Sequence, residues 1–110
     1  MLYIVVLTYI RPVEEVHAHL DTHRNWLVEY AKRGSIIVAG PLEDSSGGAL
    51  LACCKDSAEL NGMPAKDSFH VHRLVDYQVN AFTGALRADA FPPEWSPAAK
   101  AVKGLRSLGS

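Results

Sequence analysis

The stretch that decides the fold is residues 2–9, Leu-Tyr-Ile-Val-Val-Leu-Thr-Tyr. It is rich in β-branched and aromatic side chains, which favour an extended strand. Both alternating sets of side chains are apolar, the even-numbered positions as well as the odd-numbered ones. A strand of this kind must be covered on both faces of its sheet, so the sequence predicts a strand in the middle of a folded domain.

The hydrophobic period changes after this strand. Apolar residues recur at steps of three, four and seven over residues 13–33, which is typical of an amphipathic helix with one apolar stripe. We expect Pro12 in the first turn of this helix and Gly34 at its end. The stripe consists of Val13, Val16, Leu20, Leu27, Tyr30 and Ala31.

The rest of the chain supplies three more strands and a second helix. Residues 35–39 and 49–54 are short apolar runs around a polar turn, which predicts a hairpin. Asp56 is a typical cap for a short helix that ends near Pro64. Residues 69–81 predict a long final strand. The order βαββαβ predicts an α+β fold of the ferredoxin-like type, with two helices on one face of a four-stranded antiparallel sheet.

Length and composition restrict the kind of protein. The chain has 110 residues, 48% hydrophobic and 21% charged, with a net charge of −1. We expect one domain over residues 1–82 and a C-terminal extension over 83–110, with a short helix after Pro97. The charge gives no reason to expect nucleic-acid or lipid binding, and no apolar run is long enough to span a membrane. We expect a cytoplasmic protein, because the adjacent Cys53 and Cys54 are poorly placed to form a disulfide with each other.

The apolar strands also predict an oligomer. Two helices cover only one face of the sheet, yet the strands at residues 2–9, 35–39 and 49–54 are apolar on both faces. An apolar sheet face left in water exceeds what monomers usually expose. The simplest cover is the same face of a second copy, so we expect a homodimer that pairs through this sheet face.

His23 is the first candidate for chemistry. The helix stripe has a missing member at position 23, so a titratable imidazole occupies a place that faces the sheet. A buried histidine bonded to a backbone carbonyl is the plain structural alternative. Asp67 lies just before the predicted last strand, where a carboxylate usually caps a turn. If the two side chains meet, the carboxylate fixes the tautomer of the ring and makes the other ring nitrogen a general base.

Other chemistries have weaker support. His70 and His72 are two residues apart on the predicted last strand and would share a face, which invites a metal hypothesis together with His23. No carboxylate or cysteine falls at a familiar ligand spacing, so we expect no metal. Neither cysteine lies at a helix start or beside a cation, as a nucleophile would.

Several segments together resemble the YciI-related (YCII) family. The helix segment His23-Arg-Asn-Trp-Leu is followed by Gly34 and then by Ile37-Val-Ala-Gly-Pro41. The segment Asp67-Ser-Phe69 continues into His-Val-His-Arg-Leu-Val-Asp-Tyr77, which is similar to the Asp-Pro-Phe run of that family and its closing strand. The resemblance covers roughly residues 2–82 and leaves the C-terminal extension outside.

This resemblance implies a dimeric α/β barrel of ferredoxin-like subunits, with His23 and Asp67 as a catalytic dyad. It implies a small enzyme without cofactor, of the lyase or isomerase type, similar to muconolactone isomerase in fold or to a dehydrochlorinase in activity. The substrate would be a cyclic oxygenated metabolite. The alternative is a non-catalytic ligand-binding or accessory protein of the same fold. Ser68 replaces the family's proline and bears on activity rather than on fold.

Six further residues are predicted to contact the substrate. Arg11, at the end of the first strand, is expected to hold an anionic group. The others are expected to form the wall of the pocket, and they come from the Gly-Pro segment and from the residues after Asp67. They are Gly40, Pro41, Ser68, Phe69 and His70.

Overall fold

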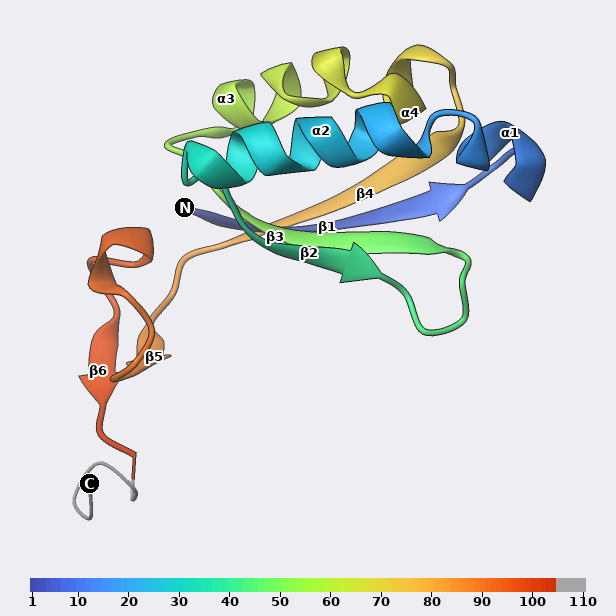
Figure 1. The fold of residues 1–110 in the computed structure, drawn as a ribbon. Helices are drawn as coiled ribbons and strands as arrows, with labels where there is room; N and C mark the ends of the chain where they lie inside the picture. Colours follow the sequence, from blue (N-terminus) through green and yellow to red (C-terminus); the bar gives the residue numbers. More distant parts are fainter. Residues whose placement is uncertain (105–110) are drawn as a thin grey trace.

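A computed structural model describes residues 1–104 of the chain. Its main feature is a four-stranded antiparallel sheet in the order β2-β3-β1-β4 (Figure 1). The ferredoxin-like α+β fold predicted from the sequence is confirmed. The strands are β1 (Leu2–Tyr9), β2 (Ile36–Pro41), β3 (Gly47–Cys53) and β4 (Val75–Phe82).

Helices cover one face of the sheet (Figure 1). The longest is α2, and α3 and α4 lie beside it in the same layer. Asp56 caps α3 as expected, because its carboxylate accepts a hydrogen bond from the Glu59 amide at 2.9 Å. The helices of this layer are α1 (Val13–His17), α2 (Leu20–Lys32), α3 (Ser57–Gly62), the short 3-10 helix η1 (Pro64–Lys66) and α4 (Ser68–Val71).

The long first helix predicted over residues 13–33 is divided in two. The break falls at His19, whose φ of −114° and ψ of 12° lie outside the helical range. The apolar stripe continues across the break, and Val16 of α1 is fully buried. Pro12 precedes α1 with an extended ψ of 147°, rather than lying in its first turn. Gly34 ends the helical segment as expected, with a φ of +80° that suits glycine.

The final strand begins later than predicted. Residues 68–71 form the helix α4, because the Asp67 carboxylate caps it by accepting a hydrogen bond from the Phe69 amide at 3.1 Å. Arg73 then takes a positive φ of 54°, which ends the helical turn before β4 starts at Val75. The prediction of a strand from residue 69 was therefore wrong, since local capping overrides the β propensity of this segment.

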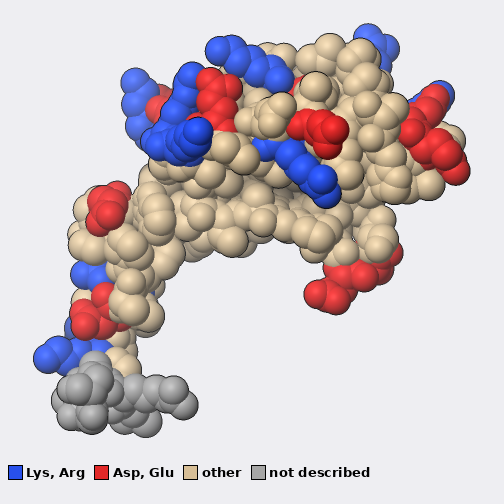
Figure 2. Space-filling model, viewed as in Figure 1, with Lys and Arg blue, Asp and Glu red and all other residues tan. Residues whose placement is uncertain are grey.

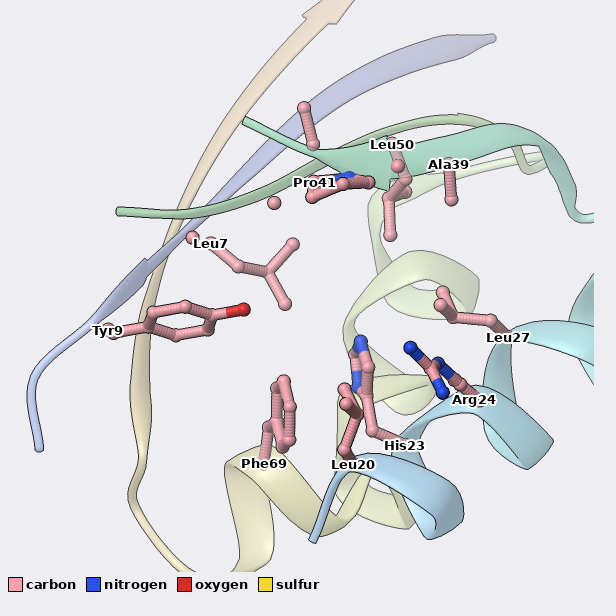
Figure 3. Close-up of a pocket in the computed structure, with 14 residues that line it drawn as sticks. Leu7, Tyr9, Leu20, His23, Arg24, Leu27, Ala39, Pro41, Leu50 and Phe69 are labelled. Atoms are coloured by element: carbon pink, nitrogen blue, oxygen red, sulfur yellow. The ribbon is translucent and has the colours of Figure 1, made fainter. Parts of the chain in front are cut away.

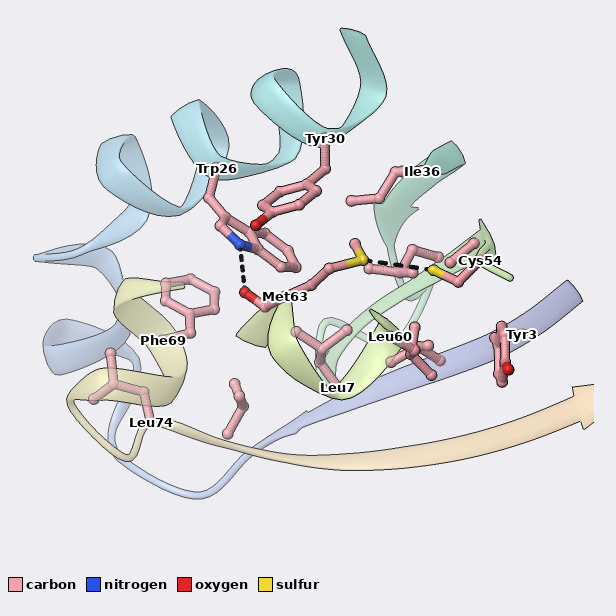
Figure 4. Close-up of a cluster of buried hydrophobic side chains, with 14 of the residues drawn as sticks. Tyr3, Leu7, Trp26, Tyr30, Ile36, Cys54, Leu60, Met63, Phe69 and Leu74 are labelled. Carbon is pink, nitrogen blue, oxygen red and sulfur yellow. Dashed lines mark hydrogen bonds between the residues drawn. The ribbon is translucent and has the colours of Figure 1, made fainter. Parts of the chain in front are cut away.

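A cluster of buried side chains fills the space between the helices and the sheet (Figure 4). Trp26 belongs to this cluster, and its indole nitrogen donates a hydrogen bond to the Met63 carbonyl at 2.9 Å. The Cys54 thiol contacts the Met63 sulfur at 3.8 Å. Burial raises the pKa of the Cys54 thiol to about 11, so it remains protonated as a small core residue.

The opposite face of the sheet is apolar and uncovered by helices. A register shift in β2 pairs Ile36 with Ala52 on the covered face and Val38 with Leu51 on the open one. Ile4 also pairs with Leu51, and the side chains of Ile4 and Val38 are 44% and 62% exposed. In Figure 2 the underside of the sheet carries few charged side chains compared with the helical layer and the hairpin tip. The apolar open face expected from the sequence is therefore present.

The C-terminal extension forms a small unit of its own beside the sheet (Figure 1). Strands β5 (Leu86–Ala88) and β6 (Lys100–Val102) pair in parallel, with the 3-10 turn η2 (Pro93–Trp95) between them. The helix predicted after Pro97 is absent from residues 97–104, where β6 forms instead. None of the helices within residues 1–104 combines the length and apolar character needed to cross a bilayer.

Candidate active site

His23 lies on the inner side of α2, where the stripe predicts it. Its ring stacks on Phe69 with 3.8 Å between centroids and an interplanar angle of 2°. A second ring, that of Trp26, lies 5.8 Å away at 25°. Aromatic rings therefore hold the imidazole in place, and the side chain is only 9% exposed. The two ring nitrogens of His23 remain available for hydrogen bonds.

Asp67 is fully buried and accepts hydrogen bonds from three directions. Its Oδ1 accepts hydrogen bonds from His23 Nδ1 at 2.7 Å and from the Phe69 amide at 3.1 Å. Its Oδ2 accepts a hydrogen bond from the Tyr77 hydroxyl. Three donors suit an ionised carboxylate, which only accepts hydrogen bonds. The Nδ1 of His23 then carries the proton, and its Nε2 presents a lone pair.

Tyr77 is a member of this network that sequence reasoning missed. It lies on β4 opposite Leu7 and faces the helices. Burial and the hydrogen bond to Asp67 raise the pKa of its phenol, so the hydroxyl keeps its proton and continues to donate. The sequence could have indicated this residue, because Tyr77 alternates with apolar residues on the side of the strand that faces the helices. A phenol hydroxyl buried there needs a hydrogen-bond partner.

A pocket of about 150 Å³ lies in front of His23, between α2 and the sheet (Figure 3). Leucines and Phe69 make its wall largely apolar, and Tyr9 and Arg24 bring polar groups to its opposite sides. An engineered apolar cavity of roughly this volume binds benzene, so the space suits one six-membered ring. The lining residues are Leu7, Tyr9, Leu20, His23, Arg24, Leu27, Ala39, Gly40, Pro41, Gly47, Gly48, Ala49, Leu50 and Phe69.

Three of the predicted contact residues line this pocket, namely Gly40, Pro41 and Phe69. Ser68 does not. Its hydroxyl accepts a hydrogen bond from the Thr22 hydroxyl at 2.7 Å and donates to the His19 carbonyl at 3.2 Å. Ser68 therefore ties α4 to the start of α2, which supports the positions of Asp67 and His23 from outside the pocket.

Arg11 and His70 lie elsewhere. The Arg11 guanidinium pairs with Glu15 at 2.9 Å and lines a separate hollow near the start of α2. His70 lies 5.8 Å from Tyr77, between ring centroids, and lines a second cavity of about 340 Å³ on the other side of the Asp67 network. The polar residues that reach the first pocket instead are Tyr9 and Arg24, which the sequence analysis did not select.

The expected shared face of His70 and His72 is not formed. Both residues belong to the helical turn before β4, and His72 stacks on His19 with 3.9 Å between centroids. Within residues 1–104 no group of three or more histidines, cysteines and carboxylates is arranged to hold a metal ion. The two histidines thus make different contacts, His70 beside Tyr77 and His72 on His19.

The model of the YCII-related domain matches residues 1–83 of this chain. The chain belongs to the YCII-related domain family. The YCII-related domain thus spans everything from β1 to the end of β4, and β5 and β6 lie beyond it. A comparison with curated protein sequences gives no match.

The YCII-related fold also appears in a solved structure of 5-chloro-2-hydroxyhydroquinone dehydrochlorinase from Burkholderia phenoliruptrix AC1100, in complex with 2,5-dihydroxybenzoquinone. The two chains share 19% sequence identity, with a TM-score of 0.59. The match covers 76% of this chain and 95% of that one. At this identity the likeness concerns the fold.

Proposed function

We propose that this YCII-related protein is a cofactor-independent enzyme of the lyase or isomerase type that acts on a small cyclic oxygenated metabolite. The observation that carries the proposal is the buried hydrogen bond of 2.7 Å between His23 Nδ1 and Asp67, at the edge of a pocket that fits one ring. The structural likeness to a dehydrochlorinase supports the same reaction type. The substrate class and the dyad mechanism are our inference from this geometry.

In the proposed reaction the Nε2 of His23 takes a proton from a hydroxyl group or an activated carbon of the ring. The electron pair of the broken bond moves into the ring, and in an elimination a leaving group such as chloride departs with its own pair. Asp67 orients the imidazole and stabilises the imidazolium that forms, while remaining ionised. The faces of Phe69 and Trp26 add a favourable environment for that cation.

The test is turnover of hydroxylated aromatic substrates by the wild type and by His23→Gln. Chlorinated hydroxyhydroquinones are the first compounds to assay, with chloride release as the readout, followed by lactones. His19→Gln is the matched control, because it changes a half-buried histidine that directly precedes the same helix and does not bond to Asp67. Equal rates for His23→Gln and the wild type would remove the dyad from the mechanism. Tight ligand binding without turnover would favour the non-catalytic alternative.

We further propose that the protein is a homodimer that pairs through the open face of its sheet. Support comes from the exposed apolar side chains there, including Ile4 and Val38. In Val38→Asp, a charge buried at the interface would dissociate the dimer. Val28→Asp is the control, since Val28 is 52% exposed on α2. Light scattering should give twice the chain mass of 12.0 kDa for the wild type and for Val28→Asp. A monomeric wild type would contradict the proposal.

Two further predictions from the sequence remain proposals. We place the protein in the cytoplasm, where a reducing medium keeps the free thiols of Cys53 and Cys54 intact. We also treat residues 1–82 as a domain that folds without the extension over 83–110. Circular dichroism of the truncated chain tests the second proposal, and loss of its cooperative unfolding transition would contradict it.

A further inference from the structure

Two polar side chains in the pocket have no part in the proton transfer proposed above. Arg24 follows His23 on α2, and Tyr9 ends β1. Figure 3 shows them on opposite sides of the pocket, with the ring of His23 between them. Their positions bear on which ligand the pocket accepts.

Arg24 carries a charge that no protein group neutralises. Arg11 and Arg33 pair with glutamates at 2.9 and 2.7 Å, whereas Arg24 has no ion-pair or hydrogen-bond partner within residues 1–104. A guanidinium offers several donors in one plane and binds anionic oxygens strongly. Arg24 is exposed to solvent while it lines the pocket, so its charge is available to an anionic ligand.

Tyr9 supplies the second polar group. Its ring is half-buried and meets Phe69 edge to face, with 6.1 Å between centroids. The hydroxyl points into the pocket (Figure 3) and has no hydrogen-bond partner in the described part of the chain. A phenol hydroxyl both donates and accepts, so it suits an oxygen substituent of a ligand.

The apolar residues of the pocket wall restrict the size and shape of the ligand. Leu7, Leu50 and Phe69 present apolar surface, and the volume of about 150 Å³ holds one six-membered ring rather than two. A ring seated there would have Arg24 at one end, Tyr9 at the other and His23 at its edge.

We infer that the ligand is a single ring with an anionic oxygen, such as a phenolate, an enolate or a hydroxyquinone anion, that pairs with Arg24. A second oxygen, across the ring, faces Tyr9. The inference rests on the proposed function only in taking this pocket as the site. It specifies charge and substitution pattern, and Arg24 is a residue that determines specificity rather than one that transfers protons.

The test is calorimetric binding of two related compounds to the full chain. The first is 2,5-dihydroxybenzoquinone, whose hydroxyls are vinylogous carboxylic acids and are therefore ionised at neutral pH. The second is the neutral 2,5-dimethoxybenzoquinone. We expect the wild type to bind the anion about tenfold more tightly or better. Arg24→Gln should lose that preference by weakening anion binding alone. Arg33→Gln removes the same charge from the end of α2 and should keep the preference.

The outcomes separate this inference from the proposed function. A preference for the anion that persists unchanged in Arg24→Gln contradicts the inference, since steric exclusion of the ether would then explain it. A wild type that binds neither compound also overturns it. If the preference depends on Arg24 while the wild type and His23→Gln show the same absence of turnover, the ligand class stands and the proposed function falls.

Discussion

His19 is the residue directly before α2 and His23 lies four residues later, within that helix, and each stacks on an aromatic ring. His19 stacks on His72 at 3.9 Å and 20°, where His72 is exposed and His19 is half-buried. His23 stacks on Phe69 at 3.8 Å and 2°, inside the protein. Stacking alone therefore does not distinguish a candidate base. The difference lies in the buried carboxylate of Asp67, which bonds to His23 and fixes which ring nitrogen is free.

Replacing the inner histidine should have the largest effect. In His23→Gln the general base is lost, and a base of this kind contributes about 10²–10⁴-fold to rate. We expect kcat/KM to fall by that factor, while His19→Gln remains within about twofold of the wild type. Steady-state kinetics of both variants provide the measurement. Similar losses in the two variants would show that the comparison between the histidines has no catalytic meaning.

Changing the carboxylate should come next. Because Oδ1 accepts hydrogen bonds from both His23 Nδ1 and the Phe69 amide, Asp67→Asn has two possible orientations. If its carbonyl oxygen stays at the Oδ1 position, the negative charge that stabilises the imidazolium is lost. If its NH2 takes that position, the His23 tautomer is reversed and the Phe69 amide loses its acceptor. We expect kcat/KM to fall by about 10²-fold or more in either orientation, because the imidazole loses its charged partner. The tautomer can be read from the ring nitrogen shifts in NMR spectra. An unchanged tautomer with unchanged kinetics would contradict this account of Asp67.

Tyr77→Phe should have a smaller effect that falls mainly on stability. It leaves the buried Asp67 with one donor fewer, which costs about 1–3 kcal/mol of unfolding free energy. The control is Tyr3→Phe, because the Tyr3 hydroxyl has no hydrogen-bond partner in the described part of the chain. Urea unfolding of both variants measures the difference, and equal stability would indicate that the hydroxyl does not support Asp67.

The pH dependence of that stability has a defined sign. Burial and then the hydrogen bond to Asp67 raise the pKa of Tyr77 above its ordinary value of 10.0. The unfolded chain therefore loses this proton first, so the stability contributed by Tyr77 is intact below about pH 10 and declines as pH rises further. Urea midpoints between pH 9 and pH 11 should fall less in Tyr77→Phe than in the wild type. A steeper fall in the variant would reverse the assignment.

Disrupting the stacked pair of His19 and His72 should have the smallest effect on activity and stability. His72→Ala removes the ring stacked on His19 at an exposed surface, where substitutions usually change stability by about 0.5 kcal/mol or less. We expect its kinetics to match the wild type. Thermal unfolding and kcat/KM together test this. A large decrease in the unfolding temperature or in kcat/KM would show that the stacked pair of His19 and His72 has a role of its own.

The contact between His23 and Asp67 could be predicted from the sequence, because the helical period of the apolar stripe places position 23 on the side that faces the sheet. His23 and Asp67 therefore meet as expected, and their use in catalysis stays a prediction. Arg24 and Tyr77 could not be found this way. Arg24 is not one of the apolar residues that mark the stripe, although it lines the pocket. The partner of Tyr77 depends on where β4 begins.

The segment after Asp67 shows where pattern reading failed. Residues 69–71 have strand-like composition, but the local cap on α4 determines their structure. The expected face shared by His70 and His72 failed with it, since it assumed a strand. Arg11 was expected at the pocket, but an ion pair with Glu15 holds it elsewhere. Such short-range hydrogen bonds and ion pairs are decided by a few atoms, which a hydrophobic period does not describe.

The carboxylate of Asp67 is shared between a structural task and the proposed chemical one. It caps a four-residue helix and also bonds to His23 and Tyr77, so its loss should weaken folding along with any activity. His23 is one of the donors to that carboxylate, but it caps no helix. A chain that replaced the histidine would lose one hydrogen bond of this network, whereas a chain that replaced the aspartate would lose three. Among relatives that do not use the proposed chemistry, the aspartate should therefore persist more often than the histidine.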